Sequence, residues 1–279
     1  MKAVYDLTGK VVLITGGSGG LGHATATALF SSGARVAIVD IDPATPDIAA
    51  RMSPTDVIGV VADVRDRGAL DHAVALVVER FGRVDIAIAN AGMLSRGATL
   101  RSIPATTIDD LFAVNINGVV NTVNAAMNQI IANHGQIVLI SSVFAFLNGI
   151  GTIPYAMSKA AIEQLGRGLR VELATHGAST TTAYFSLIET DMIKHGVDDD
   201  PTVVELLSTT LPRPLLKRLQ PAAAAAAIVD GLLCRSPRVM APARWKPFSM
   251  LRGLVNPALD ARLANDRRTR AILSELDAR

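Results

Sequence analysis

The chain has 279 residues, of which 49% are hydrophobic and 4% aromatic, and its formal net charge at pH 7 is +2. This length and apolar content suit one α/β domain with a two-sided core, and the small net charge gives no reason to expect nucleic-acid binding. No apolar run reaches the roughly 18 residues that a membrane span requires. The lone Cys234 cannot form an internal disulfide. We therefore expect a cytoplasmic protein without a signal peptide.

Short apolar strands alternate with helical patterns along most of the chain. The strands are predicted at Val11–Thr15, Arg35–Val39, Val57–Val61, Val84–Ala89, Gln136–Ser141 and Ser179–Phe185, with a last one near Arg238–Ala241. The helices are predicted at Gly20–Ser32, Asp66–Phe81, Ile108–Asn133 and Tyr155–Thr175, with a short one within Pro43–Ser53. Strands this apolar are typical of a parallel sheet that helices cover on both faces. The alternation predicts a single doubly wound, three-layer Rossmann domain.

Nothing between these elements has the composition of a linker. We therefore assign residues 1–243 to the Rossmann domain, with a substrate loop at about 187–220. Residues 244–279 form a C-terminal helical extension in this interpretation.

A glycine-rich turn follows the first predicted strand. Residues Thr15 to Gly22 read Thr-Gly-Gly-Ser-Gly-Gly-Leu-Gly and lead into the helical pattern that begins at Gly20. A strand, a glycine turn and a helix N-terminus place backbone N–H groups where a pyrophosphate can bind. Glycine is required because a Cβ would block the approach of the cofactor. The turn alone is a weak signal, which the strand, the helix and a later acidic residue strengthen.

Asp40 is that acidic residue, directly after the second predicted strand. A carboxylate at this position can accept hydrogen bonds from both ribose hydroxyls of NAD and would repel the 2′-phosphate of NADP. No basic residue stands at Gly19 or Ile41, where it could bind such a phosphate. The pattern therefore favours NAD, and the alternative is an aspartate that only caps a helix or a turn.

Two further strand ends carry polar or small residues. Asp63 follows the third strand, where it could accept a hydrogen bond from an adenine amino group with Val64 packed nearby, or could simply cap the next helix. Asn90, Ala91 and Gly92 follow the fourth strand, and small residues there let the backbone approach a cofactor, although such a tripeptide alone indicates only a turn. Because the carboxyl ends of parallel strands share one edge of a sheet, we expect these residues to form one site.

The most specific pattern is the pair Tyr155 and Lys159, which lie four residues apart on a predicted helix and therefore share one face. An ammonium group beside a phenol favours the phenolate, so we expect Lys159 and a cationic nicotinamide together to lower the pKa of Tyr155 toward neutrality. Such a tyrosine can exchange a proton with an alcohol oxygen, and Ser142 can hydrogen-bond the same oxygen. A Tyr-x-x-x-Lys pattern alone usually indicates a solvated helix face. The serine and the glycine turn argue against that interpretation.

With these motifs, the chain resembles the short-chain dehydrogenase/reductase family from about Thr8 to Val239. The resemblance rests on Thr-Gly-x-x-x-Gly-x-Gly at residues 15–22, Asn-Ala-Gly at residues 90–92 and the Tyr-Lys pair. It implies a Rossmann fold, a nicotinamide cofactor and four catalytic residues, which are Asn115, Ser142, Tyr155 and Lys159. In this family the asparagine holds a water that links the lysine to solvent. From the sequence alone Asn115 would be an ordinary polar helix residue.

The resemblance also completes the set of residues that we expect to contact NAD. It adds Thr190, which aligns with the threonine that contacts the cofactor in relatives. The expected set is Gly16, Ser18, Gly20, Leu21, Gly22, Asp40, Ile41, Asp63, Val64, Asn90, Ala91, Gly92, Tyr155, Lys159, Ile188 and Thr190. Relatives usually carry Pro-Gly where this chain has Phe185 and Ser186, so we expect an altered turn and a bulkier pocket wall there.

We predict an NAD-dependent oxidoreductase that interconverts a secondary alcohol and a ketone, with hydride passing to or from the nicotinamide while Tyr155 carries the hydroxyl proton. The expected pocket wall is apolar and favours a lipophilic substrate such as a steroid, a terpenoid or a long-chain alcohol. Its residues are Leu94, Val143, Phe144, Phe146, Leu147, Leu187, Met192 and Ile193. One alternative is an NADPH-dependent ketoreductase, which Asp40 disfavours. Another is a non-catalytic NAD-binding module, which would not need the serine, the tyrosine and the lysine.

The five histidines show no metal-ligand spacing, so we expect no metal site. Beyond the last strand, apolar residues recur at helical spacing, with Arg252, Asp260 and Arg262 on other faces. This apolar stripe is Leu251, Leu254, Val255, Leu259 and Leu263. It could pack on its own domain, on a neighbouring subunit or on a membrane surface. The mixed acids and bases of the polar face favour packing on protein. We expect a homodimer or homotetramer assembled through the helices that hold Asn115 and Tyr155.

Overall fold

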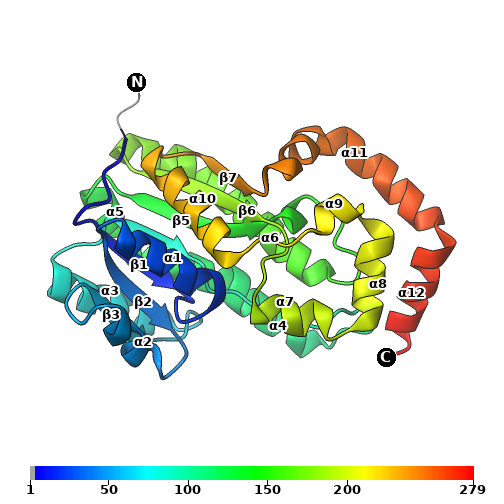
Figure 1. The fold of residues 1–279 in the computed structure, drawn as a ribbon, viewed down its shortest axis with the longest axis horizontal. Coiled ribbons are helices and arrows are strands. Elements are labelled where there is room, and N and C mark those ends of the chain that lie inside the picture. The colour runs from blue at the N-terminus through cyan, green and yellow to red at the C-terminus, as the bar shows by residue number, and fades with distance from the viewer. Residues whose placement is uncertain (1–3) are drawn as a thin grey trace.

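Residues 4–279 are described by the computed structural model, and they form one seven-stranded parallel sheet with helices on both faces (Figure 1). The strands are β1 (Val11–Thr15), β2 (Arg35–Asp40), β3 (Val57–Val61), β4 (Ile86–Ala89), β5 (Gln136–Ser142), β6 (Ser179–Phe185) and β7 (Arg238–Ala241). Their order in the sheet is β3-β2-β1-β4-β5-β6-β7. The strands follow one another outward from β1 toward one edge and from β4 toward the other, so the order of the chain switches between β1 and β4. Ligands of such sheets bind at this switch point, beyond the carboxyl ends of the strands. The predicted doubly wound Rossmann fold is confirmed.

Two layers of helices enclose the sheet. The α-helices are α1 (Gly20–Ser31), α2 (Thr45–Met52), α3 (Arg67–Phe81), α4 (Ala105–Phe112), α5 (Val119–Ala132), α6 (Ile153–Glu172), α7 (Asp191–Ile193), α8 (Pro201–Thr210), α9 (Arg213–Leu216), α10 (Pro221–Leu233), α11 (Lys246–Asn265) and α12 (Arg267–Asp277). Apolar residues of α3, α5 and α6 form one core cluster, and those of α1, α2 and α10 form the other. The sheet is therefore buried on both faces, as its continuous apolar strands require.

Alternate residues of one strand supply these two clusters. In β1, Val11 and Leu13 belong to the cluster under α3 and α5, whereas Val12 and Ile14 belong to the cluster under α1 and α10. This follows from the period of two in a strand, where successive side chains point to opposite faces. A parallel register of Val11 with Arg35 then brings the ends of β1 and β2 to the same edge.

The predicted helix Ile108–Asn133 differs from the structure. The helical segment begins three residues earlier, at Ala105, and a π-helical stretch at Ala113–Gly118 interrupts it before α5. Such a widened turn is common at functional sites, and here it contains Asn115. A sequence pattern with a period of 3.6 cannot reveal a single widened turn, because the apolar spacing on either side of it is still helical.

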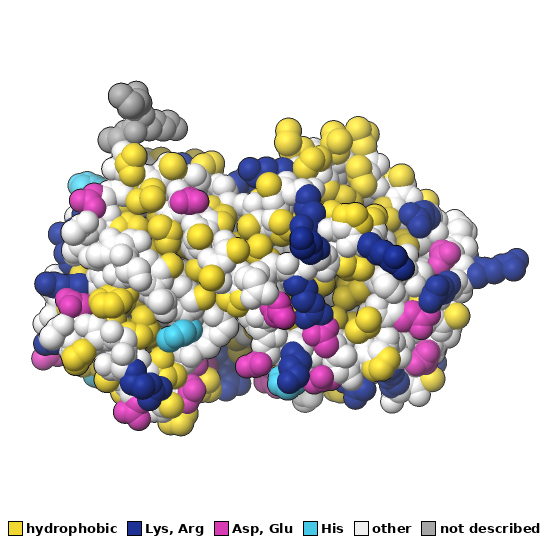
Figure 2. Space-filling model, in the orientation of Figure 1, with side chains coloured by type: hydrophobic (Ala, Val, Ile, Leu, Met, Phe, Trp, Pro, Cys, Tyr) yellow, Lys and Arg dark blue, Asp and Glu magenta, His cyan; other side chains and the backbone are white. Residues whose placement is uncertain are grey.

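The C-terminal extension forms α11 and α12, which lie at one end of the molecule beside α8 and α9 (Figures 1 and 2). Of the predicted apolar stripe, Leu263 is buried, while Leu251 and Leu254 are exposed. The stripe as a whole therefore does not pack on its own domain, which was one of the three possibilities. Among residues 4–279, no helix combines the length and the hydropathy that a membrane crossing needs.

Candidate active site

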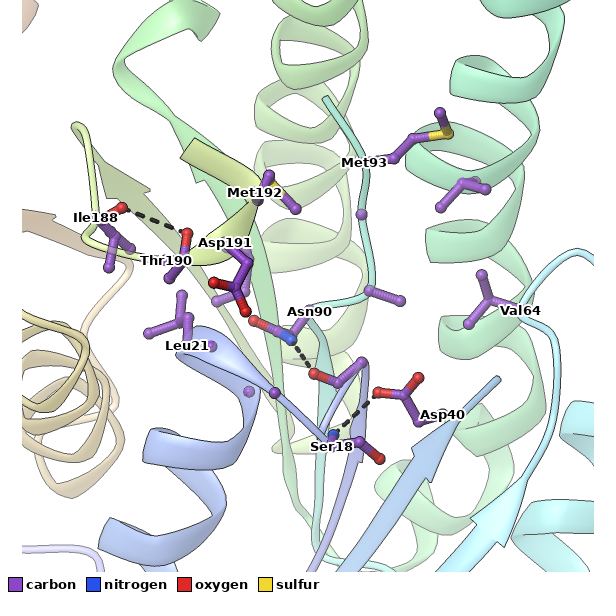
Figure 3. Close-up of a pocket in the computed structure, with 18 of the residues that line it drawn as sticks. Ser18, Leu21, Asp40, Val64, Asn90, Met93, Ile188, Thr190, Asp191 and Met192 are labelled. Carbon is purple, nitrogen blue, oxygen red and sulfur yellow. Dashed lines mark hydrogen bonds between the residues drawn. The ribbon is translucent and has the colours of Figure 1, made fainter. Parts of the chain in front are cut away.

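A cavity of about 740 Å³ lies at the carboxyl ends of β1, β2, β4 and β5. Every residue that the sequence predicts to contact the cofactor lines this cavity. Figure 3 shows part of it, with Ser18 and Asp40 on one side and Thr190 and Met192 on the other. The lining residues that the prediction missed include Asp42, Arg65, Met93, Asp110 and Asp191. Four of these five are next to or near a predicted residue in the sequence, and Asp110 lies on α4. None of the five belongs to a motif that the sequence would show by itself.

The glycine turn is shaped by close backbone contacts. Gly16 has φ +66°, and a Cβ there would lie 2.8 Å from the Cα of Ala91. A Cβ on Gly22 would lie 1.9 Å from the carbonyl oxygen of Gly16, so no larger residue fits without moving the turn. Helix α1 begins at Gly20 with no side-chain cap from Gly19, which leaves its first N–H groups without a side-chain acceptor. The turn therefore fits a pyrophosphate group.

Asn90 fastens this turn to the end of β4. Its side-chain amide donates to the carbonyl oxygens of Thr15 at 3.0 Å and Gly16 at 2.9 Å (Figure 3). Its backbone N–H donates to the hydroxyl of Thr15 at 3.2 Å. The asparagine thus holds the glycine turn in its open shape, which goes beyond the simple turn that its tripeptide indicates.

Asp40 faces the cavity, and its carboxylate accepts two backbone hydrogen bonds. Its Oδ2 accepts from the N–H of Ser18 at 2.9 Å, and its Oδ1 accepts from the N–H of Asp42 at 3.2 Å (Figure 3). It caps no helix, because Ala44 is the N-cap of α2. Asp40 therefore stabilises the turn and also lines the cavity, where its carboxylate oxygens can accept further hydrogen bonds.

Asp63 lies beside the same cavity but pairs with a near neighbour. The guanidinium of Arg65 donates to its carboxylate at 2.7 and 2.8 Å, and this hydrogen bonding lowers the pKa of Asp63. The alternative of a helix cap is wrong, since Asp66 is the N-cap of α3 and accepts from the N–H of Ala69. The carboxylate is ionised and retains acceptor capacity beside the cavity.

Asn115 is fully buried at the π-helical turn. Its amide exchanges two hydrogen bonds with the backbone of Met93, accepting from the N–H at 2.8 Å and donating to the carbonyl at 2.9 Å. A third bond runs from its Nδ2 to the hydroxyl of Ser158 at 3.2 Å. The side chain therefore joins the loop after β4 to helix α6, next to the catalytic candidates that α6 carries.

Ser142, Tyr155 and Lys159 meet at the end of β5. The hydroxyl of Ser142 donates to the carbonyl of Phe185 at 3.2 Å and accepts from the N–H of Phe144 at the same distance. The ammonium of Lys159 lies 5.5 Å from the centre of the Tyr155 ring and donates to the carbonyl of Ile140 at 3.1 Å. The three side chains line the large cavity together.

Burial moves the pKa values of Tyr155 and Lys159 apart. It raises the pKa of Tyr155 to about 12, although the Ser142 hydroxyl partly lowers it. It lowers the pKa of Lys159 from 10.5 to about 8. Lys159 by itself therefore does not bring the pKa of the tyrosine near neutrality, because loss of hydration on burial raises that pKa, and the expected joint effect of the lysine and a cationic nicotinamide stays a prediction. In this structure the phenol is neutral at pH 7, and a further positive charge is needed to release its proton.

A second, narrow cavity of about 70 Å³ adjoins the first, and Ser142 and Tyr155 line both. Its walls are mostly apolar, and four of the predicted wall residues belong to it. These are Leu94, Phe144, Leu187 and Ile193. The prediction missed the wall that α8 supplies through Val203, Leu206 and Leu207. Their helical spacing is the signal that could have identified it.

Several predicted wall residues lie elsewhere. Met192 lines the large cavity instead of the narrow one. Val143, Phe146 and Leu147 pack beneath Trp245 in a cluster that the C-terminal extension covers. Phe185 adds no bulk to the narrow cavity, because its side chain is buried in the core cluster under α1 and α10. The alternation of side chains along a strand turns Phe185 toward that core.

The doubly wound sheet, the glycine turn and the acid after β2 together define the class of α/β proteins that bind dinucleotides. Residues 10–201 match the family model described as short chain dehydrogenase. The chain therefore belongs to the short-chain dehydrogenase family, whose members are oxidoreductases that use a nicotinamide cofactor.

Two curated relatives illustrate the similarity. BbsD of Thauera aromatica, a dehydrogenase subunit named for a hydroxy(phenyl)methyl-succinyl-CoA, is 37% identical over 188 residues, or 66% of this chain and 75% of its own. The 2-(R)-hydroxypropyl-CoM dehydrogenase of Xanthobacter autotrophicus is 32% identical over 196 residues, or 68% of this chain and 78% of its own.

A solved short-chain type dehydrogenase/reductase from Mycobacterium marinum has the same fold, with a TM-score of 0.76 at 23% identity. The match covers 85% of this chain and 95% of that one. A 3-ketoacyl-(acyl-carrier-protein) reductase from Brucella melitensis, solved with NADH, gives a TM-score of 0.73 at 22% identity.

Proposed function

We propose that this protein is an NAD-dependent oxidoreductase that interconverts a secondary alcohol and a ketone on a lipophilic small molecule. The observation that carries the proposal is the position of Ser142 and Tyr155, which line both the large cavity and the narrow apolar one. A substrate oxygen at that junction can contact both hydroxyls, while its carbon skeleton lies among apolar side chains.

The large cavity fits a dinucleotide. A Cβ on Gly19 would meet no atom within 4 Å, so the turn leaves open space beside the uncapped end of α1. The residues that would hold the cofactor are the sixteen that the sequence predicts, because all of them line this cavity. Asp40 supports NAD over NADP, since its carboxylate would accept from ribose hydroxyls and repel a 2′-phosphate.

The four catalytic candidates take different roles in this proposal. A bound nicotinamide ring supplies the acceptor or donor of the hydride. Ser142 orients the substrate oxygen, and Tyr155 gives or takes the proton of that oxygen. Lys159 is mostly protonated at pH 7 with its pKa of about 8, and it favours the phenolate electrostatically. Asn115 fixes the loop after β4 against α6 and supports proton exit.

The lipophilic substrate follows from the walls of the narrow cavity. Besides Phe144 and Leu187, three leucine and valine side chains of α8 close it. The names of BbsD and of the hydroxypropyl-CoM dehydrogenase both contain a hydroxyl-bearing group, which supports an alcohol as the reduced substrate. The apolar walls disfavour a sugar-like polyol, whose hydroxyls would lack partners there.

The proposal extends to the organisation of the chain. Residues 1–243 would act as the oxidoreductase domain, with a substrate loop at about 187–220 that includes α8, and residues 244–279 as an extension of it. A homodimer or homotetramer and a cytoplasmic location complete the proposal. Light scattering of the purified protein measures the oligomeric state.

The direct test incubates the protein with NAD and a panel of lipophilic secondary alcohols and follows NADH fluorescence. We expect turnover with at least one alcohol, little turnover with NADP and none with polyols of similar length. A protein that binds NADH but oxidises no member of the panel, and reduces no corresponding ketone, would instead be a non-catalytic NAD-binding module.

A further inference from the structure

Two polar side chains in the first half of helix α11 point toward the domain. Two N–H groups of Arg252 donate to the carboxylate of Glu163 on α6, each at 2.9 Å. Asn256 donates to the carbonyl of Phe146 at 2.9 Å. Glu163 is buried, so its pairing with Arg252 fixes the rotation of the helix about its axis. The opposite face of α11 must then point away from the domain.

That opposite face is apolar and open to solvent. Met250 is 80% exposed, Leu254 is 78% exposed and Leu251 is 53% exposed, and Pro247 is exposed beside them. Spacings of three and four residues place these side chains in one row along the helix. Figure 2 shows apolar side chains projecting over α11. We call these four residues the α11 patch.

Basic side chains border the α11 patch. Arg213 and Lys217 come from the segment of α9, Arg244 comes from the short turn before α11, and Lys246 is the first residue of α11. Arg244 donates to the carbonyl of Lys217, which holds the two segments together. Within residues 4–279, none of these four pairs with a carboxylate, and several dark blue side chains lie around α9 in Figure 2. The surface combines exposed apolar groups with unpaired positive charge.

The charges and the size of this surface decide what it fits. A second copy of the chain would bring the same bases face to face, and like charges oppose such a contact. Four apolar side chains are also few beside the roughly 20–30 residues per partner of a stable protein interface. A helix lying in the plane of a lipid surface needs only one apolar face, and anionic headgroups attract its basic border.

We propose that the α11 patch and its four bases dock this protein on an anionic lipid surface. The apolar side chains enter the headgroup region, and Arg213, Lys217, Arg244 and Lys246 contact the acidic headgroups. The inward ion pair of Arg252 keeps the helix on the domain while its outer face binds. This proposal does not depend on the proposed enzymatic function.

Sedimentation with vesicles tests the proposal on the full chain. We expect binding to vesicles of phosphatidylcholine with phosphatidylglycerol, weak binding to phosphatidylcholine alone, and release as the salt concentration rises. The variant M250E/L254E removes the apolar contact, and K217E/K246E reverses part of the basic border. Each should lower the vesicle-bound fraction by at least about tenfold, because both contributions are needed for a surface helix to bind.

A matched control is V4E, which alters an apolar residue that is 69% exposed near the N-terminus, outside the α11 patch and outside α6. It should bind vesicles as the wild type does, and thermal unfolding of all variants checks that each is folded. Equal binding by the wild type and M250E/L254E would overturn the proposal, as would failure of the wild type to bind anionic vesicles. A lipid-free wild-type mass in light scattering that falls in M250E/L254E would show that a second copy covers the patch.

Discussion

The cofactor edge of the sheet and the C-terminal extension show opposite relations between sequence and structure. At the cofactor edge, small and acidic residues lie where parallel strands end, and all of them line one cavity. In the first half of α11, Arg252 faces the domain while Leu254 faces solvent, which is opposite to the polarity that the apolar spacing predicts, whereas Leu263 near the end of the helix is buried as predicted. The residues of a site that lies at strand ends can be recognised from short stretches of sequence, because the ends of parallel strands meet at one edge. The orientation of an added helix depends on which distant residue it meets, here Glu163.

The largest effect is expected where the cofactor edge performs chemistry. Replacing Tyr155 with phenylalanine should lower kcat by about 10²–10⁴-fold, as removal of an acid–base group usually does. NADH affinity should change little, because the other fifteen predicted cofactor residues that line the cavity remain in place. Steady-state kinetics and NADH fluorescence measure the two quantities. More than about a tenth of the wild-type activity would remove Tyr155 from its proposed role.

The next prediction concerns the buried lysine of the same site. Burial lowers the pKa of Lys159 to about 8, so between that pH and 10.5 the unfolded chain holds a proton that the folded protein has lost. The free energy of unfolding of the wild type, relative to Lys159→Met, should therefore rise across this window by up to about 3 kcal/mol. Below pH 8 the difference should be flat. Urea unfolding at several pH values measures it.

A lysine on the surface supplies the control for that pH series. Lys194 is exposed, and its replacement by methionine should give no pH-dependent difference in the same window. A flat difference for Lys159 as well would mean that the ammonium is not desolvated in solution.

The third prediction tests how the extension is held at its far end. Asp200 is 2% exposed and accepts hydrogen bonds from the guanidinium groups of Arg96 and Arg279, and the bond with Arg279 is the main reason its pKa falls to about 2. Asp200→Asn should lower the free energy of unfolding by about 2 kcal/mol, the usual cost of losing charged hydrogen bonds. The loss should vanish as pH falls through 4 to 2, where the wild-type carboxylate takes up its proton.

The exposed ion pair of Glu205 with Arg268 is the matched control for Asp200. Glu205→Gln should change stability by less than about 1 kcal/mol, as surface pairs do. Equal effects of the two substitutions would show that burial of Asp200 does not strengthen its contacts.

The smallest effect is expected on the outer face of α11. Leu254→Ala should change the free energy of unfolding by less than about 0.5 kcal/mol, because the side chain contacts little of the folded protein. Leu263→Ala, on the buried side, should cost about 2 kcal/mol. Chemical denaturation compares them. A large loss at Leu254 would mean that a partner subunit buries this face in solution.

Much of the fold and of the cofactor cavity could be predicted, because apolar strand runs and glycine spacing act locally. The strand Ser179–Phe185 has the predicted bounds, and the sheet is of the predicted doubly wound class. The π-helical turn at Asn115 could not be predicted, since it depends on hydrogen bonds to Met93 across the site. The pKa of Tyr155 could not be predicted either, because the extent of its burial is set by tertiary packing.

Titration calorimetry of the wild-type protein with NADH and with NADPH tests the central claim most directly, since it needs no knowledge of the substrate. The account predicts tighter binding of NADH, because Asp40 accepts from ribose hydroxyls and repels a 2′-phosphate. The preference should shift toward NADPH in the variant Asp40→Ser with Ile41→Arg. Equal or tighter binding of NADPH by the wild type would contradict the role of Asp40, and failure to bind either cofactor would contradict the assignment of the cavity.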